Sequence, residues 1–301
     1  MRKYLYGILI LCFIPFFNSC ISYVTFNKSY PPEISLMENE KRIALINLYD
    51  YTQLEYSNDR KKEVFISGLN QLTDGVARSF RDDPTYELIS GDSLVTGQLN
   101  SYLPSPLSAD SVKFFCKKYE VTLLLALEAF DVYFDKEIEV EEDDKGNKSR
   151  TAYYTLNVRA GFTLYDSTGN VIDRSYVEHS QPHGGGRPVV LRIVSVAPSL
   201  GKAGEEVNFL ADEAGRSYAD KFYPRKMLVS RSVHNSKPFK EITPLLKSKE
   251  WNKAITKLKE LANSKDSKTA QHAAKNLAVA YEALGNEEAF NYWQQRSKRK
   301  Y

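Results

Sequence analysis

A serine and four histidines are the residues of this chain whose chemistry could support nucleophilic catalysis. Ser93 follows Gly91-Asp92, and His183 precedes three consecutive glycines. A serine hydroxyl is barely ionised at neutral pH, so it attacks an ester only when a base such as histidine takes its proton. None of the histidines has an aspartate three residues before it. The sequence therefore offers a candidate nucleophile, Ser93, and a candidate base, His183, without a complete catalytic set.

Two short segments resemble motifs of known hydrolases. Gly91-Asp92-Ser93-Leu94 resembles the signature of the GDSL esterases, which implies an ester hydrolase using Ser93, with an aspartate three residues before its histidine. His183-Gly184-Gly185-Gly186 resembles the oxyanion loop of some α/β-hydrolases, whose Gly-x-Ser-x-Gly pattern this chain lacks. The favoured interpretation is a turn at Gly91–Ser93 and a flexible loop at residues 183–186. The hydrolase is kept as an alternative.

Metal ligation is the next chemistry to consider. His179 and His183 have the spacing of a helical pair, but the predicted strand and glycine loop would not aim both rings at one ion. The acidic residues between 139 and 144 lack the glycine and the ligand order of a calcium loop, so a solvated face is expected. Cys116 lies on an apolar helical stripe and is expected in the core. We expect no metal and no cofactor.

Cys20 ends a stretch that is typical of a secretory signal. Arg2 and Lys3 precede an apolar run from Leu5 to Phe17, and Ser19 comes directly before the cysteine. This resembles the lipobox of bacterial lipoproteins, which implies that residues 1–19 are removed and that Cys20 is acylated. An ordinary signal peptide or an uncleaved anchor are the alternatives. Residues 21–25 lack the acidic residues that resemble a surface-export signal in Bacteroidota-type lipoproteins, so we expect an outer-membrane anchor facing the periplasm.

The charge of the mature chain limits the kind of partner it can attract, and its cysteine content limits the disulfides it can form. Removal of residues 1–19 takes Arg2 and Lys3 and leaves 39 basic and 38 acidic side chains. A balance this close to neutral predicts no overall attraction to nucleic acid. Only Cys116 then remains beside the modified Cys20, so no internal disulfide is expected.

The hydrophobic pattern predicts a tether at residues 20–40 and a mixed α/β domain at residues 41–235. An apolar run at 42–48 predicts a strand, and apolar residues at helical spacing between Phe65 and Phe80 predict an amphipathic helix. Ser108 is a plausible N-cap for a second helix. Further strands are expected at 86–89, 121–134, 154–164 and 171–178, a charged hairpin loop at 137–150, and a helix at 205–222. The sheet should be parallel early in the chain and antiparallel later.

The last segment, residues 240–301, has helical periodicity throughout. Trp251, Ala254 and Ile255 fall on one stripe, and Gly285-Asn286 interrupts the pattern. The spacing resembles about one and a half tetratricopeptide repeats, which implies a small helical region that binds a protein partner. Under this resemblance the candidate contacts are Asn276, Tyr281 and Trp293, each of which could equally belong to the core. A helical hairpin that only packs is the alternative.

The whole chain resembles an uncharacterised Bacteroidota-type envelope lipoprotein family. Its α/β part is similar to the curli-secretion lipoprotein and to the amino-terminal domain of the TolB translocation protein, through the strand at 42–48 and the helix before Pro224. The resemblance implies this architecture and no known chemistry. Because no complete catalytic set is found, we expect a membrane-anchored, non-enzymatic binding or scaffolding protein of the cell envelope. The alternatives are the hydrolase using Ser93 and a secretion-pore component using the hairpin at 121–165.

Overall fold

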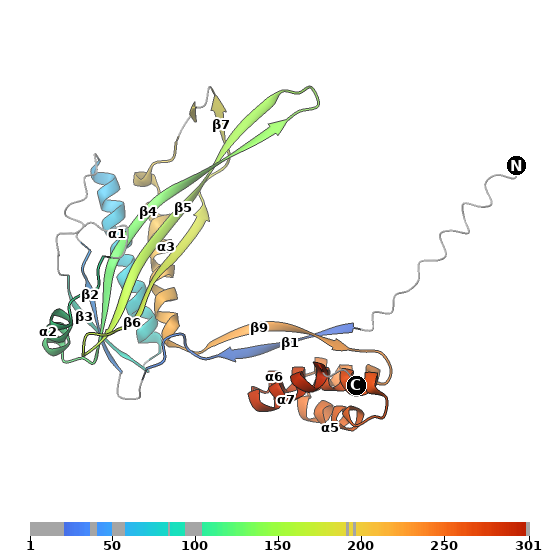
Figure 1. Ribbon diagram of the computed structural model, residues 1–301. Coiled ribbons are helices and arrows are strands. Elements are labelled where there is room, and N and C mark those ends of the chain that lie inside the picture. The colour runs from blue at the N-terminus through green and yellow to red at the C-terminus, as the bar shows by residue number, and fades with distance from the viewer. Residues whose placement is uncertain are drawn as a thin grey trace, which may run out of the picture. The chain divides into compact units, whose positions relative to one another are not determined.

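The protein, seen here as a computed structural model, divides into two compact units (Figure 1). The structure describes residues 21–36, 41–49, 58–83, 85–93, 104–190, 193–194 and 197–298. The body unit is Pro31–Pro224, and the ribbon unit combines the segment ending at Tyr30 with the segment that starts at Arg225. The predicted class, a mixed α/β domain followed by a helical region, is confirmed.

The body unit is built on one mixed sheet. β2 lies between β3 and β4 and is parallel to both, whereas β4 and β5 pair antiparallel with each other. Both β6 and β7 pair with β5, and β8 pairs with β7. The strands are β2 (Arg42–Asn47), β3 (Glu87–Ser93), β4 (Leu123–Glu142), β5 (Lys148–Asp166), β6 (Val171–Pro182), β7 (Arg187–Val190) and β8 (Ile193–Val194).

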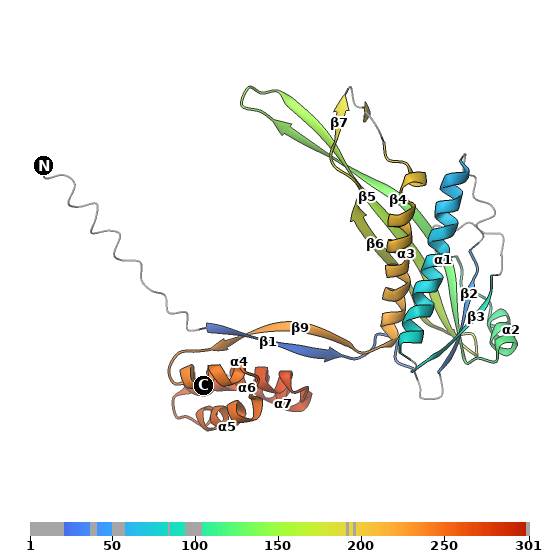
Figure 2. The ribbon, with the colours of Figure 1, turned by 180° about the vertical axis from the view of Figure 1, so that it is seen from behind.

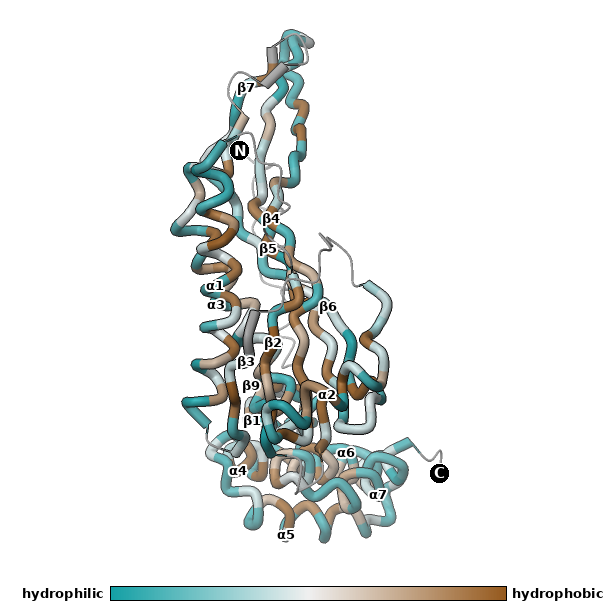
Figure 3. The backbone as a smooth tube through the Cα atoms, turned by 90° about the vertical axis from the view of Figure 1, so that its left-hand side faces the viewer, coloured by the Kyte–Doolittle hydropathy of each residue, from teal (hydrophilic) through white to brown (hydrophobic). Residues whose placement is uncertain are grey.

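Helices cover both faces of this sheet to different extents. On one face lie α1 (Asp59–Asp82) and α3 (Gly204–Ala219), which is preceded by the 3-10 turn Leu200–Lys202 and extended by the 3-10 turn Asp220–Phe222 (Figure 2). The apolar stripe of α1 enters the main core together with Phe130, Phe162 and Tyr218. Hydrophobic residues recur along α1 and α3 (Figure 3). On the other face, α2 (Ala109–Tyr119) buries Val112 and Cys116. Ser108 caps α2, as predicted.

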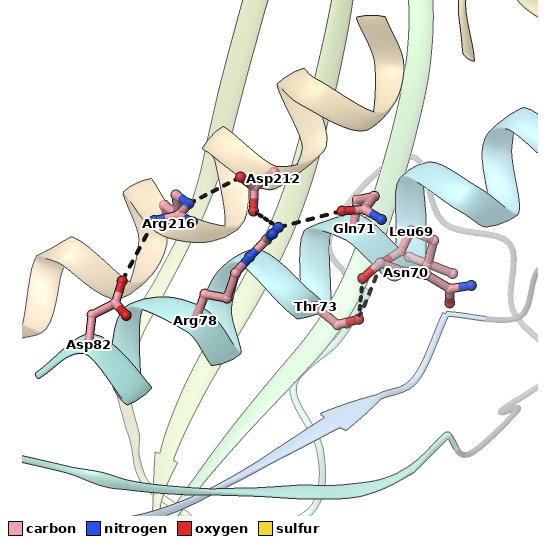
Figure 4. Close-up of polar contacts among 8 residues, drawn as sticks. All are labelled: Leu69, Asn70, Gln71, Thr73, Arg78, Asp82, Asp212 and Arg216. Atoms are coloured by element: carbon pink, nitrogen blue, oxygen red, sulfur yellow. Dashed lines mark hydrogen bonds and ion pairs between the residues drawn. The ribbon is translucent and has the colours of Figure 1, made fainter. Parts of the chain in front are cut away.

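The pair α1 and α3 approaches so closely that glycine is required at the contact. A Cβ on Gly215 would lie 2.1 Å from the carbonyl oxygen of Leu72, and a Cβ on Gly75 would lie 2.4 Å from that of Asp212. Polar side chains join the same helices along their outer side, where Asp212 accepts from Arg78 and, at 3.1 Å, from Nε of Arg216 (Figure 4). Residue size and charge therefore both fix the spacing of this helix pair.

The charged stretch at 137–150 is not the predicted hairpin loop. β4 continues to Glu142 and β5 starts at Lys148, so only a tight turn separates them, with Gly146 at φ 80° and the Asp143 side chain accepting from the backbone N–H of Asn147. The prediction is wrong because charge alone does not indicate a loop: an exposed antiparallel pair tolerates charged residues on both faces. The hairpin β4–β5 extends past the rest of the sheet (Figure 1).

The ribbon unit consists of two strands and a helical layer. β1 (Ile21–Tyr30) pairs antiparallel with β9 (Arg225–His234), and Val24, Phe26 and Val233 face the helices. Phe26 meets the ring of Trp251 edge-on with centroids 5.8 Å apart. The helical layer contains the 3-10 turn Phe239–Glu241, α4 (Thr243–Lys247), α5 (Trp251–Ala262), α6 (Ser267–Ala283) and α7 (Glu287–Lys298).

Three sequence expectations about boundaries need correction. Residues 21–30 form β1 and not a tether, because alternate residues of this segment are apolar and pack on the helices. Residues 225–234 were assigned to the α/β domain, but they form β9 of the ribbon unit. Gly91–Ser93 is the end of strand β3 and not a turn after it.

Candidate binding sites

The proposed nucleophile and base of the hydrolase alternative are far apart. Strand pairing across the sheet puts Ser93 on β3 level with Ser175 on β6, four strands away. Strands lie about 4.8 Å apart, so this step alone is roughly 19 Å. His183 lies beyond the end of β6, roughly 25 Å further along the strand direction. Ser93 and His183 do not form a catalytic pair.

His183 and the glycines after it have a structural role that the geometry explains. The His183 N–H donates to the carbonyl of Tyr154 at 2.8 Å, and its ring nitrogen Nδ1 contacts the carboxylate of Glu206. The glycines carry the chain from β6 to β7, both of which pair with β5. A Cβ on Gly186 would lie 2.5 Å from Cγ2 of Thr151. β6 and β7 thus follow the same edge of β5, and Gly186 lies too close to Thr151 for a residue with a Cβ.

Asn276, a predicted partner contact, is occupied inside the ribbon unit. Its side chain is fully buried, its Oδ1 accepts from the N–H of His234 at 2.8 Å, and its Nδ2 donates to the carbonyl of His234 at 3.0 Å. The amide thus pairs with the last residue of β9 as a further strand would. Asn276 is not a surface residue, because a buried amide must satisfy its donors and acceptors within the fold.

The two aromatic candidates differ in exposure. Trp293 is buried in the helical layer, where Arg296 lies 5.0 Å from its ring. Tyr281 is partly buried against the same core, and the ammonium of Lys259 lies 5.9 Å from its ring. Trp293 therefore belongs to the core, and Tyr281 is the one of the three predicted contacts that keeps an accessible edge. Cys20 lies outside the described residues.

A cavity of about 310 Å³ lies in the ribbon unit between β1 and the turn that joins α6 to α7. Three consecutive residues of β1, Asn27 to Ser29, line one wall. Since alternate residues of a strand point to opposite faces, a run of three consecutive residues indicates that the strand presents its edge to the cavity. The opposite wall is formed by Glu282, Ala283, Leu284, Gly285, Glu287 and Phe290. We refer to this as the Lys28 cavity.

Charged groups organise the floor of the Lys28 cavity. The Glu282 carboxylate, only 4% exposed, is bound by Lys28 at 3.1 Å and by Nη2 of Arg231 at 2.8 Å. Burial alone would raise the pKa of Glu282, but the hydrogen bonds from Arg231 and Lys28 lower it, so the carboxylate is ionised. The Lys28 ammonium also lies 5.7 Å from the ring of Phe290. The cavity therefore has a polar floor of paired charges, an aromatic side and an exposed apolar residue, Leu284, at its rim.

The sheet face of the body unit that is opposite α1 and α3 carries a second polar cluster. Glu128 is buried and accepts from Thr163 at 2.7 Å and from the Tyr165 hydroxyl at 2.8 Å. Burial raises the pKa of Glu128, and the two hydrogen bonds and the charge of Arg174 reduce this effect. Across the part of the chain that the structure describes, no three His, Cys, Asp or Glu side chains gather closely enough to hold a metal ion.

The hairpin β4–β5 is the pair of strands that the secretion-pore hypothesis places in a membrane. Its exposed apolar residues Ile138 and Val140 share a strand face with Lys136, and Val140 pairs with Arg150. The opposite face carries Glu137, Glu139 and Glu141 along β4. Charged residues thus occur on both faces, an arrangement that suits water on either side. None of the helices in the described ranges is long and apolar enough to cross a membrane.

A family model described as "Domain of unknown function (DUF8603)" matches residues 38–234, more than half of the chain. The chain belongs to this family. A second model, "Domain of unknown function (DUF6340)", matches residues 240–301, the region in which the sequence resembles tetratricopeptide repeats. The DUF8603 match ends at the last residue of β9, so the ribbon unit combines β9 from DUF8603, the helices of DUF6340 and β1, which precedes both matches. No curated protein matches the chain.

Several solved structures are similar to this chain at low scores. The PelC dodecamer from Paraburkholderia phytofirmans has 10% identity and a TM-score of 0.27, over 67% of this chain and 99% of the other. A putative neuraminyllactose-binding hemagglutinin homolog from Helicobacter pylori has 14% identity and a TM-score of 0.29, over 64% and 90%. The rare lipoprotein B from Shewanella oneidensis has 13% identity and a TM-score of 0.25, over 60% and 90%. At these scores the similarity carries no inference about function.

The sequence pattern alone does not predict the Lys28 cavity. Lys28 lay in the expected tether and Arg231 in the DUF8603 part, whereas Glu282 lies in the DUF6340 part. The alternation of Val24, Phe26 and Lys28 on one side of residues 21–30 was the signal that could have shown a strand. Pairing between positions about 200 residues apart, such as Lys28 with Met227, has no local signature.

Proposed function

We propose that this protein is a lipid-anchored, non-enzymatic binding protein of the cell envelope, held at the outer membrane through Cys20. Its partner binds by adding a strand to the open edge of β1, next to the Lys28 cavity. The hydrolase alternative lacks support because Ser93 and His183 are far apart. The observation that carries the proposal is the edge of β1 that lines the cavity along Asn27 to Ser29.

Strand addition fits the pairing of the ribbon. Within the described residues β1 and β9 form a sheet of two strands, so each has an edge that no other strand covers. Alternate residues of a strand direct their N–H and C=O groups to such an edge, which makes it a template for an incoming chain. Partners that bind in this way gain affinity from backbone hydrogen bonds and specificity from side-chain pockets.

The side of the cavity formed by α6 and α7 supplies the pocket that such a partner would need. Leu284 is 45% exposed at its rim, and the Phe290 ring lies beside the Lys28 ammonium. An apolar side chain of the added strand would bury against these two residues. Polar groups of the same strand would meet Asn27 and Ser29. The expected partner is therefore an extended protein segment with alternating apolar and polar residues.

In-cell photocrosslinking tests this site. A photoreactive residue at Leu284 should capture one predominant protein, and fragmentation should map the crosslink to an extended segment of it. The control position is Tyr292, which is 56% exposed on α7 and does not line the cavity. The same proteins captured from both positions, or none from Leu284, would contradict strand addition at this edge.

The anchor is tested separately. Mass spectrometry of the protein extracted from membranes should find an acylated amino-terminal Cys20, and Cys20→Ala should release the protein from the membrane fraction. An unmodified Cys20, or a chain that retains residues 1–19, would contradict the anchor without affecting the crosslinking result.

A further inference from the structure

The charges of this protein are divided unequally between its two units. Residues 21–30 and 225–301 of the ribbon unit contain 18 Lys and Arg against 7 Asp and Glu, while residues 31–224 contain 21 against 31. The near-neutral total therefore conceals a strongly basic unit and an acidic one. A net charge summed over the whole chain cannot detect such a division.

Several of these basic groups surround the end of the ribbon where β1 starts. Ile21 pairs with His234, and Lys237 follows that residue closely in the chain. Tyr23 pairs with Ser232, whose hydroxyl lies 3.3 Å from the Lys275 ammonium. Lys268 precedes Lys275 by two turns of α6, a spacing that puts both on one side of the helix.

The same end of the ribbon exposes apolar groups. Tyr23 is 68% exposed and Ile21 is 43% exposed, both on the ribbon face that points away from Val24 and Phe26. Lys240 lies in the turn beside Phe239, whose ring centroid is 6.2 Å from that of His272. An aromatic and an aliphatic residue within a group of lysines is the composition that favours the boundary between lipid headgroups and water.

We propose that the ribbon unit binds anionic phospholipid headgroups through this patch, made of Ile21, Tyr23, Lys237, Lys240, Lys268 and Lys275. The inference rests in part on the proposed anchor, because Ile21 directly follows Cys20 and an acylated Cys20 would hold the start of β1 within a few ångströms of the headgroups. At that distance, less than one Debye length of about 8 Å, the lysine charges act on the membrane with little screening. One lipid-modified residue and a basic patch together make a more stable attachment than either alone.

Lipid is favoured over nucleic acid by the position of the patch. A nucleic-acid site places basic groups along the phosphates of an extended backbone. The basic groups of this patch instead surround Ile21, the residue next to the proposed anchor at Cys20. The acidic body unit is then expected to be repelled by the same anionic surface.

Vesicle binding of the unacylated chain tests the inference independently of the anchor. The chain that starts at residue 20 and carries Cys20→Ser should bind vesicles containing 30 mol% phosphatidylglycerol, and binding should weaken as salt is raised. The triple variant Lys237→Gln, Lys240→Gln, Lys268→Gln should bind at least tenfold more weakly. The corresponding triple Arg variant should keep the affinity, and so should Lys113→Gln, Lys117→Gln, Lys136→Gln, which removes the same charge from exposed lysines of the body unit.

Any of three results would overturn the lipid-binding inference. The chain binds vesicles of phosphatidylcholine alone equally well, both triple Gln variants lose vesicle affinity equally, or the chain binds a DNA duplex as tightly as the anionic vesicles. Circular dichroism of every variant confirms that folding is retained. If mass spectrometry finds no acyl group while the unacylated chain binds anionic vesicles as described, the lipid-binding inference stands and the anchor fails. If mass spectrometry finds the acyl group but the unacylated chain does not bind anionic vesicles, the anchor stands and the lipid-binding inference fails.

Discussion

The side-chain amide of Asn276 is paired with both backbone groups of His234, accepting from its N–H at 2.8 Å and donating to its carbonyl at 3.0 Å. One buried residue of α6 thus ends strand β9 and ties the ribbon to the helical layer.

Asn276→Ala should destabilise the ribbon unit by about 1–3 kcal/mol, because it leaves the part-buried N–H and C=O of His234 without their side-chain partner. Both tryptophans of the chain, Trp251 and Trp293, lie in this unit, so tryptophan fluorescence during urea titration reports its unfolding selectively. The control is Asn252→Ala, at an exposed position of α5, which should change the stability by less than about 0.5 kcal/mol. Equal effects of the two substitutions would mean that the amide pairing does not matter.

Acid should weaken the ribbon unit. The rings of His234 and His272 stack with centroids 3.5 Å apart. Burial, and then the neighbouring His272 and lysine charges, lower the pKa of His234 to about 4, and burial lowers that of His272. Between pH 6.5 and about 4 the unfolded chain binds more protons than the folded chain, so stability is lost as the pH falls through this window. The urea midpoint of tryptophan fluorescence should decrease from pH 7 to pH 5, and decrease less in His272→Gln. An unchanged pH dependence in that variant would contradict the assignment.

Gly215→Ala should destabilise the body unit by about 1–3 kcal/mol, although alanine favours helices, because the added Cβ would meet the carbonyl oxygen of Leu72 at 2.1 Å. The control is Gly185→Ala, since a Cβ at Gly185 has nothing within 4 Å. Thermal unfolding followed by far-UV circular dichroism measures both. A melting temperature lowered equally by the two substitutions would show that the close helix contact is not the cause.

Glu128→Gln should stabilise the body unit at neutral pH by about 1 kcal/mol, because it removes a buried charge that the fold disfavours. Thr163 and Tyr165 both donate to the carboxylate, so the amide oxygen accepts from one of these hydroxyls and the other turns to accept from the amide N–H. Burial raises the pKa of Glu128, so the folded chain keeps a proton that the unfolded chain loses, and stability falls as the pH rises above about 4.5. Calorimetry of wild type and variant from pH 4 to pH 8 should show curves that diverge as the pH rises. Parallel curves would indicate that Glu128 is not protonated more readily in the fold.

Most of the body unit could be predicted from sequence because its signals are local. The helix stripe from Phe65 to Phe80 and the alternation from Tyr154 to Leu164 bury the residues they predicted. The ribbon could not be found in the same way, because β1 and β9 are distant in sequence and each is half exposed. Charged residues at the ends of strands also lead to a wrong prediction, because residues 137–150 are expected to form a loop and instead mostly pair as strands.

The candidate sites were less predictable than the fold. The resemblance to tetratricopeptide repeats makes Asn276 a candidate contact, but a sequence pattern does not distinguish a surface amide from a buried one that pairs with a strand backbone. The residues of the Lys28 cavity come from three separated segments, so only the folded arrangement brings them together.

The register of the ribbon has a mechanical consequence. Both connections to the body unit leave the same end of the ribbon, where Tyr30 pairs with Arg225, while Cys20 precedes the other end. Tension between an anchored Cys20 and the body unit would pass along the backbone of β1, which is already extended at about 3.3 Å per residue and has little slack. The helices and the hydrogen bonds to β9 lie outside this load path, so the ribbon unit would transmit a pull without having to unfold.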